Sequence, residues 1–122
     1  MPAIAKLDSF ALDAADPRAL AEFYSALTGL PIERDDGEWV QLVSDGGAAL
    51  AFQLAPGHRP PVWPSDDQPQ QAHLDFEVGD LDDGEQAVMG IGARKAEFQP
   101  APDSFRVFLD PAGHPFCLVL DH

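Results

Sequence analysis

The sequence predicts an α+β fold made of two tandem βαβββ modules that form a curved mixed sheet around a trough. The hydrophobic pattern changes along the chain in the order strand, helix and three strands, and this order occurs twice. A shift of 64 positions also places Asp16, the expected cap of the first helix, on Asp80, the expected cap of the second. Because the apolar faces stay in phase under this shift, we interpret the chain as an internal duplication. The alternative is an unrelated α+β domain whose spacing is a coincidence.

The first module spans residues 4–54. Residues 6–12 alternate between apolar and polar, as strands do. The next segment predicts a helix, with Asp16 at the N-cap, Pro17 at the first helical position and Gly29 just past the end. Three short strands, separated by "DDG" and "SDGG" turn signals, are expected at residues 31–35, 38–43 and 48–54.

A Pro-rich linker at residues 55–70 leads to the second module, residues 71–122. A strand at residues 71–79 is followed by a helix that Asp80 caps and that runs to about Gly92. This helix has two internal glycines and is therefore the weaker of the two. The last three strands are expected at residues 94–98, 105–110 and 115–120.

Composition limits the function classes. The 122 residues make one domain, and a formal net charge of −14 provides no basic surface for a nucleic-acid backbone. We interpret this charge as an aid to solubility, with a preference for cationic ligands as the alternative. No apolar run has the length of a membrane span, and the N-terminus lacks the pattern of a signal peptide. The single cysteine, Cys117, excludes an internal disulfide framework and suggests a cytoplasmic location.

The duplication also predicts a site. The stretch "QQAHLDFEVGD" contains His73, which the 64-position shift pairs with Ser9, and the same shift pairs Gln53 with Cys117. Equivalent positions in two facing modules approach the same trough. We therefore expect four side chains to converge there: Ser9, Gln53, His73 and Cys117.

Two carboxylates share the predicted strand face of His73. Alternation places Asp75 and Glu77 on that face, further along the strand. We expect them to form a solvated rim rather than part of a metal site.

Three segments carry a resemblance to a known family: "LDSFALDAADPRALAEFYSALTGLPI", "HLDFEVGDL" and "FLDPAGHPFCLV". They are similar to the opening strand and helix, the fifth strand and the closing hairpin of the vicinal oxygen chelate superfamily, in its glyoxalase and bleomycin-resistance-like branch. The resemblance implies paired βαβββ modules and frequent homodimers. It also implies, in catalytic members, a divalent metal held by residues of the first, fourth, fifth and eighth strands.

Carried over to this chain, the four ligand positions of the family are Ser9, Gln53, His73 and Cys117, of which only His73 matches the usual ligand chemistry. We therefore expect no cofactor. The alternative is a divalent metal, for example zinc bound by His73, Gln53 and Cys117. Without a metal, His73 is a neutral histidine hydrogen-bonded to Gln53 or Ser9. Cys117 is then a small apolar filler, with a nucleophile as its alternative role.

Four further residues are candidate contacts for a ligand. Trp39 is either a pocket wall or part of a dimer contact. We expect Trp63 in a linker strap at the pocket edge, and the alternative is a lid that carries it over the mouth of the trough. Arg106 and Phe108 share a strand face. For Arg106 we favour a salt bridge to an acidic residue over an anchor for a substrate carboxylate.

The sequence leaves three function classes open. The first, which we favour, is a metal-free protein that binds and sequesters a small organic molecule, as a homodimer without nucleic-acid or membrane partners. The second is a metal-dependent lyase, isomerase or dioxygenase of the glyoxalase type. The third is a metal-free enzyme that uses His73 as its acid–base group. The fold alone does not decide among them.

Overall fold

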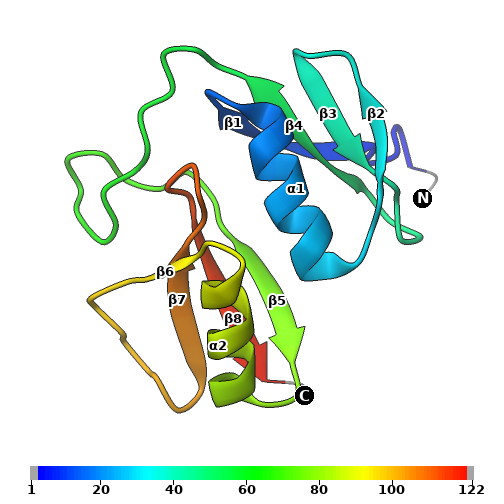
Figure 1. Ribbon diagram of the computed structural model, residues 1–122. Coiled ribbons are helices and arrows are strands. Elements are labelled where there is room, and N and C mark those ends of the chain that lie inside the picture. The colour runs from blue at the N-terminus through cyan, green and yellow to red at the C-terminus, as the bar shows by residue number, and fades with distance from the viewer. Residues whose placement is uncertain (1–2, 121–122) are drawn as a thin grey trace. The chain divides into compact units, whose positions relative to one another are not determined.

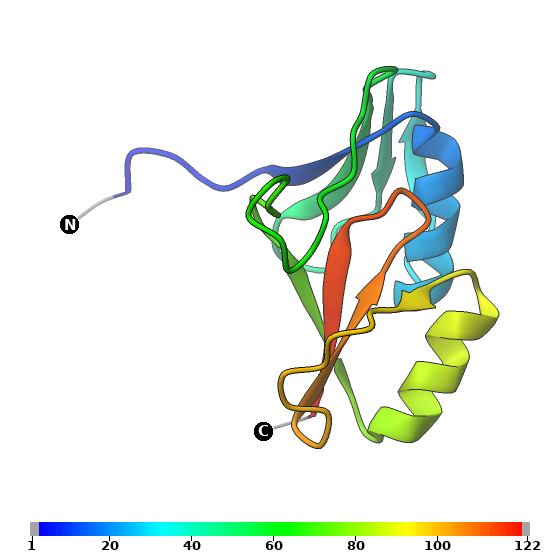
Figure 2. The same ribbon diagram turned by 90° about the vertical axis from the view of Figure 1, so that its left-hand side faces the viewer.

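The computed structural model describes residues 3–120, which cluster into two compact units, one up to His58 and the other from Arg59 onward. Each unit contains one helix and one four-stranded mixed sheet. In Figures 1 and 2, α1 lies over one face of the first sheet and α2 over one face of the second. The predicted pair of βαβββ modules is confirmed.

The first module contains five elements: β1 (Ser9–Ala14), α1 (Pro17–Thr28), β2 (Ile32–Asp35), β3 (Trp39–Leu42) and β4 (Ala49–Leu54). The strand order is β1-β4-β3-β2, with β1 parallel to β4 and the other pairs antiparallel. The first strand begins at Ser9 rather than at the predicted residue 6, because its pairing with β4 starts there.

Helix α1 begins and ends where its local chemistry predicts. The Asp16 side chain accepts a hydrogen bond from the backbone N–H of Ala19, and Pro17 occupies the first turn. Gly29 ends the helix with a φ of 78°, a left-handed conformation that favours glycine, and its N–H donates to the carbonyl of Ser25. These three residues therefore set both helix boundaries.

The core of the first module lies between α1 and its sheet. Tyr24 of α1 is fully buried and stacks on Phe52 of β4, with ring centroids 5.4 Å apart. Val40 and Leu42 of β3 are also fully buried on this side. The alternate residues of the strands, including Trp39 and Gln53, lie on the opposite surface, which we call the helix-free face.

The second module repeats the plan with β5 (Leu74–Val78), α2 (Leu81–Gly90), β6 (Arg94–Lys95), β7 (Phe105–Leu109) and β8 (Pro115–Leu120). Its strand order, β5-β8-β7-β6, is the same as in the first module, and β5 is parallel to β8. Asp80 caps α2 by accepting from the N–H of Asp83 at 2.8 Å. The helix ends at Gly90, two residues before the predicted boundary.

Strand β6 is much shorter than predicted, and Gln99 explains why. Its side-chain amide donates to the carbonyl of Val107 and accepts from the N–H of Val107, at 2.8 and 2.9 Å. The carbonyl of Val107 still accepts from the N–H of Ala96 at 3.1 Å, but the N–H of Val107 donates to the side chain of Gln99 rather than to a backbone carbonyl. The strand pairing ends at Lys95 as a consequence.

Gly84 allows α2 to lie close to its sheet. A Cβ atom at this position would be 3.1 Å from Leu118 Cδ1 and 3.2 Å from Val78 Cγ1. The glycine weakens the isolated helix but removes this steric conflict. Beneath the helix, Phe108 and Phe116 are fully buried and stack with centroids 5.8 Å apart.

Most of the Pro-rich linker belongs to the second unit. Its backbone folds on itself, since Val62 N–H donates to the carbonyl of Gln68 and Ser65 N–H donates to that of Val62. Pro60 lies against the β7–β8 turn at Gly113, where a Cβ atom would be 2.5 Å from the Cβ of Pro60. The linker is therefore an ordered strap on the second module.

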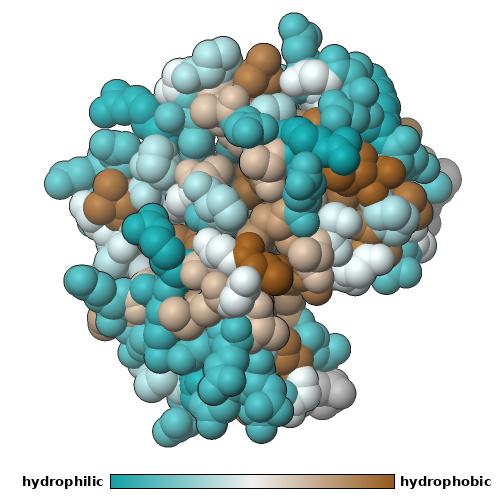
Figure 3. Space-filling view, viewed as in Figure 1, coloured by the Kyte–Doolittle hydropathy of each residue, from teal (hydrophilic) through white to brown (hydrophobic). Residues whose placement is uncertain are grey.

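In Figure 3, hydrophilic side chains cover the exposed side of α2. Asp82 and Asp83 lie in the first turn of this helix, where negative charge is favourable next to the helix N-terminus. None of the helices in residues 3–120 is both long enough and apolar enough to cross a membrane.

Candidate functional site

The candidate site of the second module lies on its helix-free face, at the start of β5. The sheet register places Asp75 opposite Cys117 of β8, and Cys117 opposite Val107 of β7. His73 directly precedes β5, whose first residue is Leu74. The parallel pairing of β5 and β8 thus brings an imidazole, a carboxylate and a thiol to one corner of the sheet.

His73 and Asp75 form the polar part of this corner. The Nε2 atom of His73 lies 3.2 Å from Oδ1 of Asp75, and both side chains are about half exposed, at 42% and 54%. A carboxylate at this distance favours the neutral histidine tautomer that carries its proton on Nε2. The Nδ1 atom then has a free lone pair that can accept a proton.

Cys117 is the buried part of the corner, with an exposure of 8%. Burial, the negative charge of Asp75 and a hydrogen bond with Asp75 raise the pKa of its thiol to about 11. The group is therefore a protonated thiol at neutral pH, and only the thiolate is a strong nucleophile. This environment supports the predicted role as a small apolar filler.

The three side chains also fit a zinc ion by their chemistry. One ligand atom from each of His73, Asp75 and Cys117 lies within 4.8 Å of the other two. Imidazole nitrogen, carboxylate oxygen and thiolate sulfur are all zinc ligands, at about 2.0–2.3 Å from the metal. A small inward movement of the side chains would be needed to reach such distances.

This grouping differs from the predicted one in its carboxylate. Asp75 was expected at a solvated rim, but it lies between His73 and Cys117 and contacts both. Within the second unit, His73 contacts Asp75. Its predicted hydrogen bond to Gln53 or Ser9 stays a prediction. Those two residues belong to the first unit, whereas His73 and Cys117 belong to the second.

The two predicted residues of the first module share a face but are not neighbours. Ser9 pairs with Ala49 at the start of β4, whereas Gln53 pairs with Asp13 at the end of β1. Four residues of strand separate the two positions, or about 13 Å along the sheet. The two positions therefore share a face of the first module without lying side by side on it. Their predicted convergence on a trough with His73 and Cys117 stays a prediction.

Gln53 instead lies beside Trp39, its partner on β3. The two side chains line a cavity of about 450 Å³ together with Asp36, Glu38, Leu54 and Pro56. The indole N–H of Trp39 donates to Oε1 of Gln41 at 2.9 Å. Trp39 was predicted as a pocket wall or a dimer contact, and its place in this lining agrees with the first interpretation.

Trp63 covers the helix-free face of the second module. It packs against a buried cluster formed by Ala96, Val107 and Cys117. Its ring also contacts Phe98, with centroids 5.7 Å apart. The side chain that was expected at a pocket edge thus lies over the thiol of the candidate site, within the same unit.

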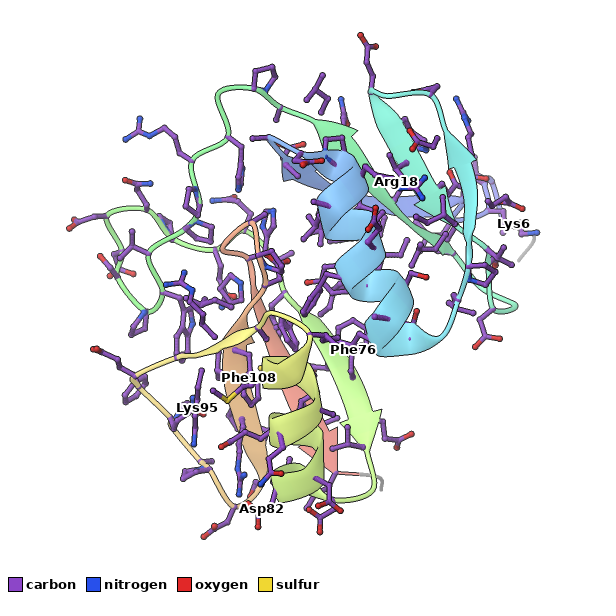
Figure 4. The ribbon with its side chains drawn as sticks, viewed as in Figure 1. Lys6, Arg18, Phe76, Asp82, Lys95 and Phe108 are labelled. Atoms are coloured by element: carbon purple, nitrogen blue, oxygen red, sulfur yellow. The ribbon has the colours of Figure 1, made fainter. Side chains whose placement is uncertain are left out.

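Arg106 and Phe108 lie on the other side of the sheet, under α2. The Nη1 atom of Arg106 is 2.7 Å from Oδ1 of Asp82 and 3.2 Å from Oε1 of Glu85, so the salt-bridge interpretation is confirmed. Phe108 is fully buried and has no surface for a ligand in this unit. Figure 4 labels Phe108 beneath the helix and Asp82 on it. Neither side chain shares the face of His73.

The fold is that of a glyoxalase-like protein of the vicinal oxygen chelate type. A family model described as a glyoxalase-like domain matches residues 9–119, and the chain belongs to this family. No curated protein matches the chain in sequence.

Solved structures share the fold at low sequence identity. A glyoxalase/bleomycin resistance protein/dioxygenase family enzyme from Burkholderia phytofirmans PsJN is 19% identical with a TM-score of 0.69, over 95% of this chain and 98% of its own. The fosfomycin resistance protein FosX from Listeria monocytogenes is 13% identical with a TM-score of 0.72, over 98% and 96%. A possible glyoxalase from Bacillus cereus is 16% identical with a TM-score of 0.69, over 96% and 99%.

Proposed function

We propose that this chain binds a small organic molecule and moves a proton with His73, without a metal at that position. The observation that carries the proposal is the 3.2 Å contact between His73 Nε2 and Asp75 Oδ1 on the helix-free face of the second module. A histidine oriented by a carboxylate is a general arrangement for acid–base catalysis. The reaction class is that of a lyase or isomerase.

Each side chain of the corner has a distinct role in this proposal. Nδ1 of His73 removes a proton from a carbon next to a substrate carbonyl, and the resulting imidazolium can return that proton to a neighbouring carbon. Asp75 orients the imidazole through its contact with Nε2. Cys117 stays a neutral thiol, because its pKa is raised to about 11.

Deuterium exchange tests the proton transfer directly. The protein is incubated in D₂O with a panel of α-hydroxyketones, and loss of the α-proton is followed by ¹H NMR. We expect His73→Gln to slow the exchange by about 10²–10⁴-fold, the usual contribution of a general base. Asp75→Asn should slow it less, with a changed pH profile, because it acts through His73.

His58→Gln is the matched control, since His58 is a histidine of the other unit. Equal exchange rates in wild type and His73→Gln would contradict the acid–base role. Saturable binding without any exchange would leave sequestration of the ligand as the function and contradict catalysis.

A second candidate function is favoured by the fit of the same three residues to zinc. In that case His73, Asp75 and Cys117 would hold the ion, and the metal would supply polarisation of a substrate oxygen. Cys117 would have to lose its proton on binding, so zinc affinity should rise with pH.

Elemental mass spectrometry of untagged protein, purified without chelator, separates the two candidates. Near-stoichiometric zinc in wild type that is lost in His73→Ala would overturn the metal-free proposal. A melting temperature that does not respond to added zinc or to chelator would support it.

We also propose a homodimer in the cytoplasm. Large apolar side chains are exposed in the N-terminal segment and β1, namely Ile4, Leu7 and Phe10, and they support burial against a second copy. Sedimentation equilibrium gives the mass. A monomer at micromolar concentration would contradict the dimer.

A further inference from the structure

The cavity of the first module is lined by acidic side chains and by no basic ones. It occupies about 450 Å³ where β3 begins and β4 ends. Its polar groups are the carboxylates of Asp36 and Glu38 and the amide of Gln53. Its apolar side chains are Trp39, Leu54 and Pro56. No Lys, Arg or His is among the lining residues. All of them belong to the first unit.

The two carboxylates differ in how they are held. Asp36 accepts hydrogen bonds from the backbone N–H groups of Trp39 and Glu38, at 2.8 and 3.0 Å, and lies 3.3 Å from Nη2 of Arg34. These bonds lower its pKa, so Asp36 is ionised at neutral pH and fixed in place. The carboxylate of Glu38 has no ion pair among residues 3–120. Its negative charge is therefore available to a ligand.

Trp39 presents π surface rather than a hydrogen-bond donor. The single N–H of its indole donates to Oε1 of Gln41 at 2.9 Å. This hydrogen bond fixes the indole through a residue of the same strand, β3. The ring therefore contributes carbon atoms to the cavity lining. An aromatic ring of this kind attracts cations through its quadrupole, and tryptophan does so most strongly.

We infer that this cavity binds a small organic cation, with Trp39 against its alkylated ammonium group and Glu38 as the counter-charge. Gln53 Oε1 provides a further acceptor for a hydroxyl or N–H of the ligand. The net charge of −14 favours cations in general. The inference rests on the proposed binding of a small organic molecule, but not on proton transfer by His73.

Choline and its neutral isostere 3,3-dimethylbutan-1-ol test the charge requirement. They are titrated into the ¹⁵N-labelled full chain, and the amide shifts of Glu38 and Gln53 are followed. We expect saturable shifts with choline and affinity at least about tenfold weaker for the alcohol. Equal binding of the two, or no saturation up to about 100 mM choline, would overturn the inference.

Single substitutions test whether choline binds in this cavity. Glu38→Gln should weaken choline binding by about fivefold to tenfold, whereas Glu33→Gln removes the same charge from the neighbouring strand β2 and should change it less than twofold. Trp39→Leu should weaken binding more than Trp39→Phe, which keeps an aromatic ring. Equal effects of Glu38→Gln and Glu33→Gln would show attraction by overall charge only and contradict a site.

His73→Ala serves to separate the two proposals. It should leave choline binding unchanged while it abolishes α-proton exchange. Loss of exchange with intact choline binding therefore supports both, and each measurement can fail without the other.

Discussion

The two modules share a strand order but differ on the face that their helix leaves uncovered. In the first module this face carries Trp39 beside polar or small side chains such as Ala11 and Gln53. In the second, Val107 and Cys117 form a buried apolar cluster under Trp63 of the linker strap. The first face thus borders an open cavity, whereas the strap covers the second.

The helix-covered faces, by contrast, have stayed alike. Phe52 and Phe116 are related by the shift of 64 positions, and both are fully buried against another aromatic ring. A packed core tolerates little change in volume, whereas a partly exposed face does not have this restriction. We infer that the two copies have diverged mainly on their helix-free faces, where their side chains differ in chemistry.

The largest expected effect comes from removing the two equivalent core rings, those of Phe52 and Phe116. Phe52→Ala and Phe116→Ala should each lower the free energy of unfolding by about 3–5 kcal/mol, because each leaves a cavity in a fully packed core. Urea denaturation measures both. Phe98→Ala, at a ring that is 53% exposed, is the control and should cost much less. A small effect at only one core position would break the equivalence.

The next test removes the rings of the two helix-free faces. Trp63→Ala should cost about 2 kcal/mol through lost apolar burial and the lost contact with Phe98. It should also expose Cys117 and speed its reaction with a chromogenic thiol reagent. Trp39→Ala, in the other module, should leave the thiol reaction unchanged. Slow labelling of Cys117 in Trp63→Ala would argue against the strap as its cover.

The helix caps should give nearly equal effects. Asp16→Ala and Asp80→Ala each remove one side-chain acceptor at a helix N-terminus, which costs about 1 kcal/mol. Thermal and urea unfolding measure the change. Glu22→Ala, which breaks an exposed ion pair with Arg18, is the control and should cost less than about 0.5 kcal/mol.

The smallest expected effect is on the stability of the protein at acidic pH. The pKa of Asp36 lies below 3.8 in the folded chain, because the N–H groups of Trp39 and Glu38 bind its charged form. Its contribution to stability is complete above pH 3.8 and is lost as the pH falls through the folded pKa. Wild type should therefore lose more stability on acidification than Asp36→Asn.

The parts of the fold that depend on local chemistry could be predicted from the sequence. Asp16, Pro17 and Gly29 determine the limits of α1 through their own hydrogen bonds and backbone angles. The shift of 64 positions identified the second copy because it keeps helix and strand faces in phase. The family resemblance agreed with both, and the glyoxalase-like domain confirms it.

The composition of the site could not be predicted in the same way. Strand alternation has a period of two, so it fixes the face of a side chain but not its neighbour across the sheet. The register places Gln53 opposite Asp13 but Cys117 opposite Asp75, a difference of two residues that leaves the faces unchanged. Asp75 was therefore left out of the predicted site. The contacts of Trp63 and Arg106 depend on distant residues that no local pattern specifies.

Strand β5 lies at the edge of its own sheet, and its charged residues therefore have a second effect. A terminal strand presents unpaired backbone groups that can recruit a strand from another molecule and start aggregation. Asp75 and Glu77 are exposed on this strand, and their charges oppose such recruitment. The carboxylate that orients His73 thus also protects the protein in concentrated solution. Replacing both acids by valine should therefore lower solubility even where folding is intact.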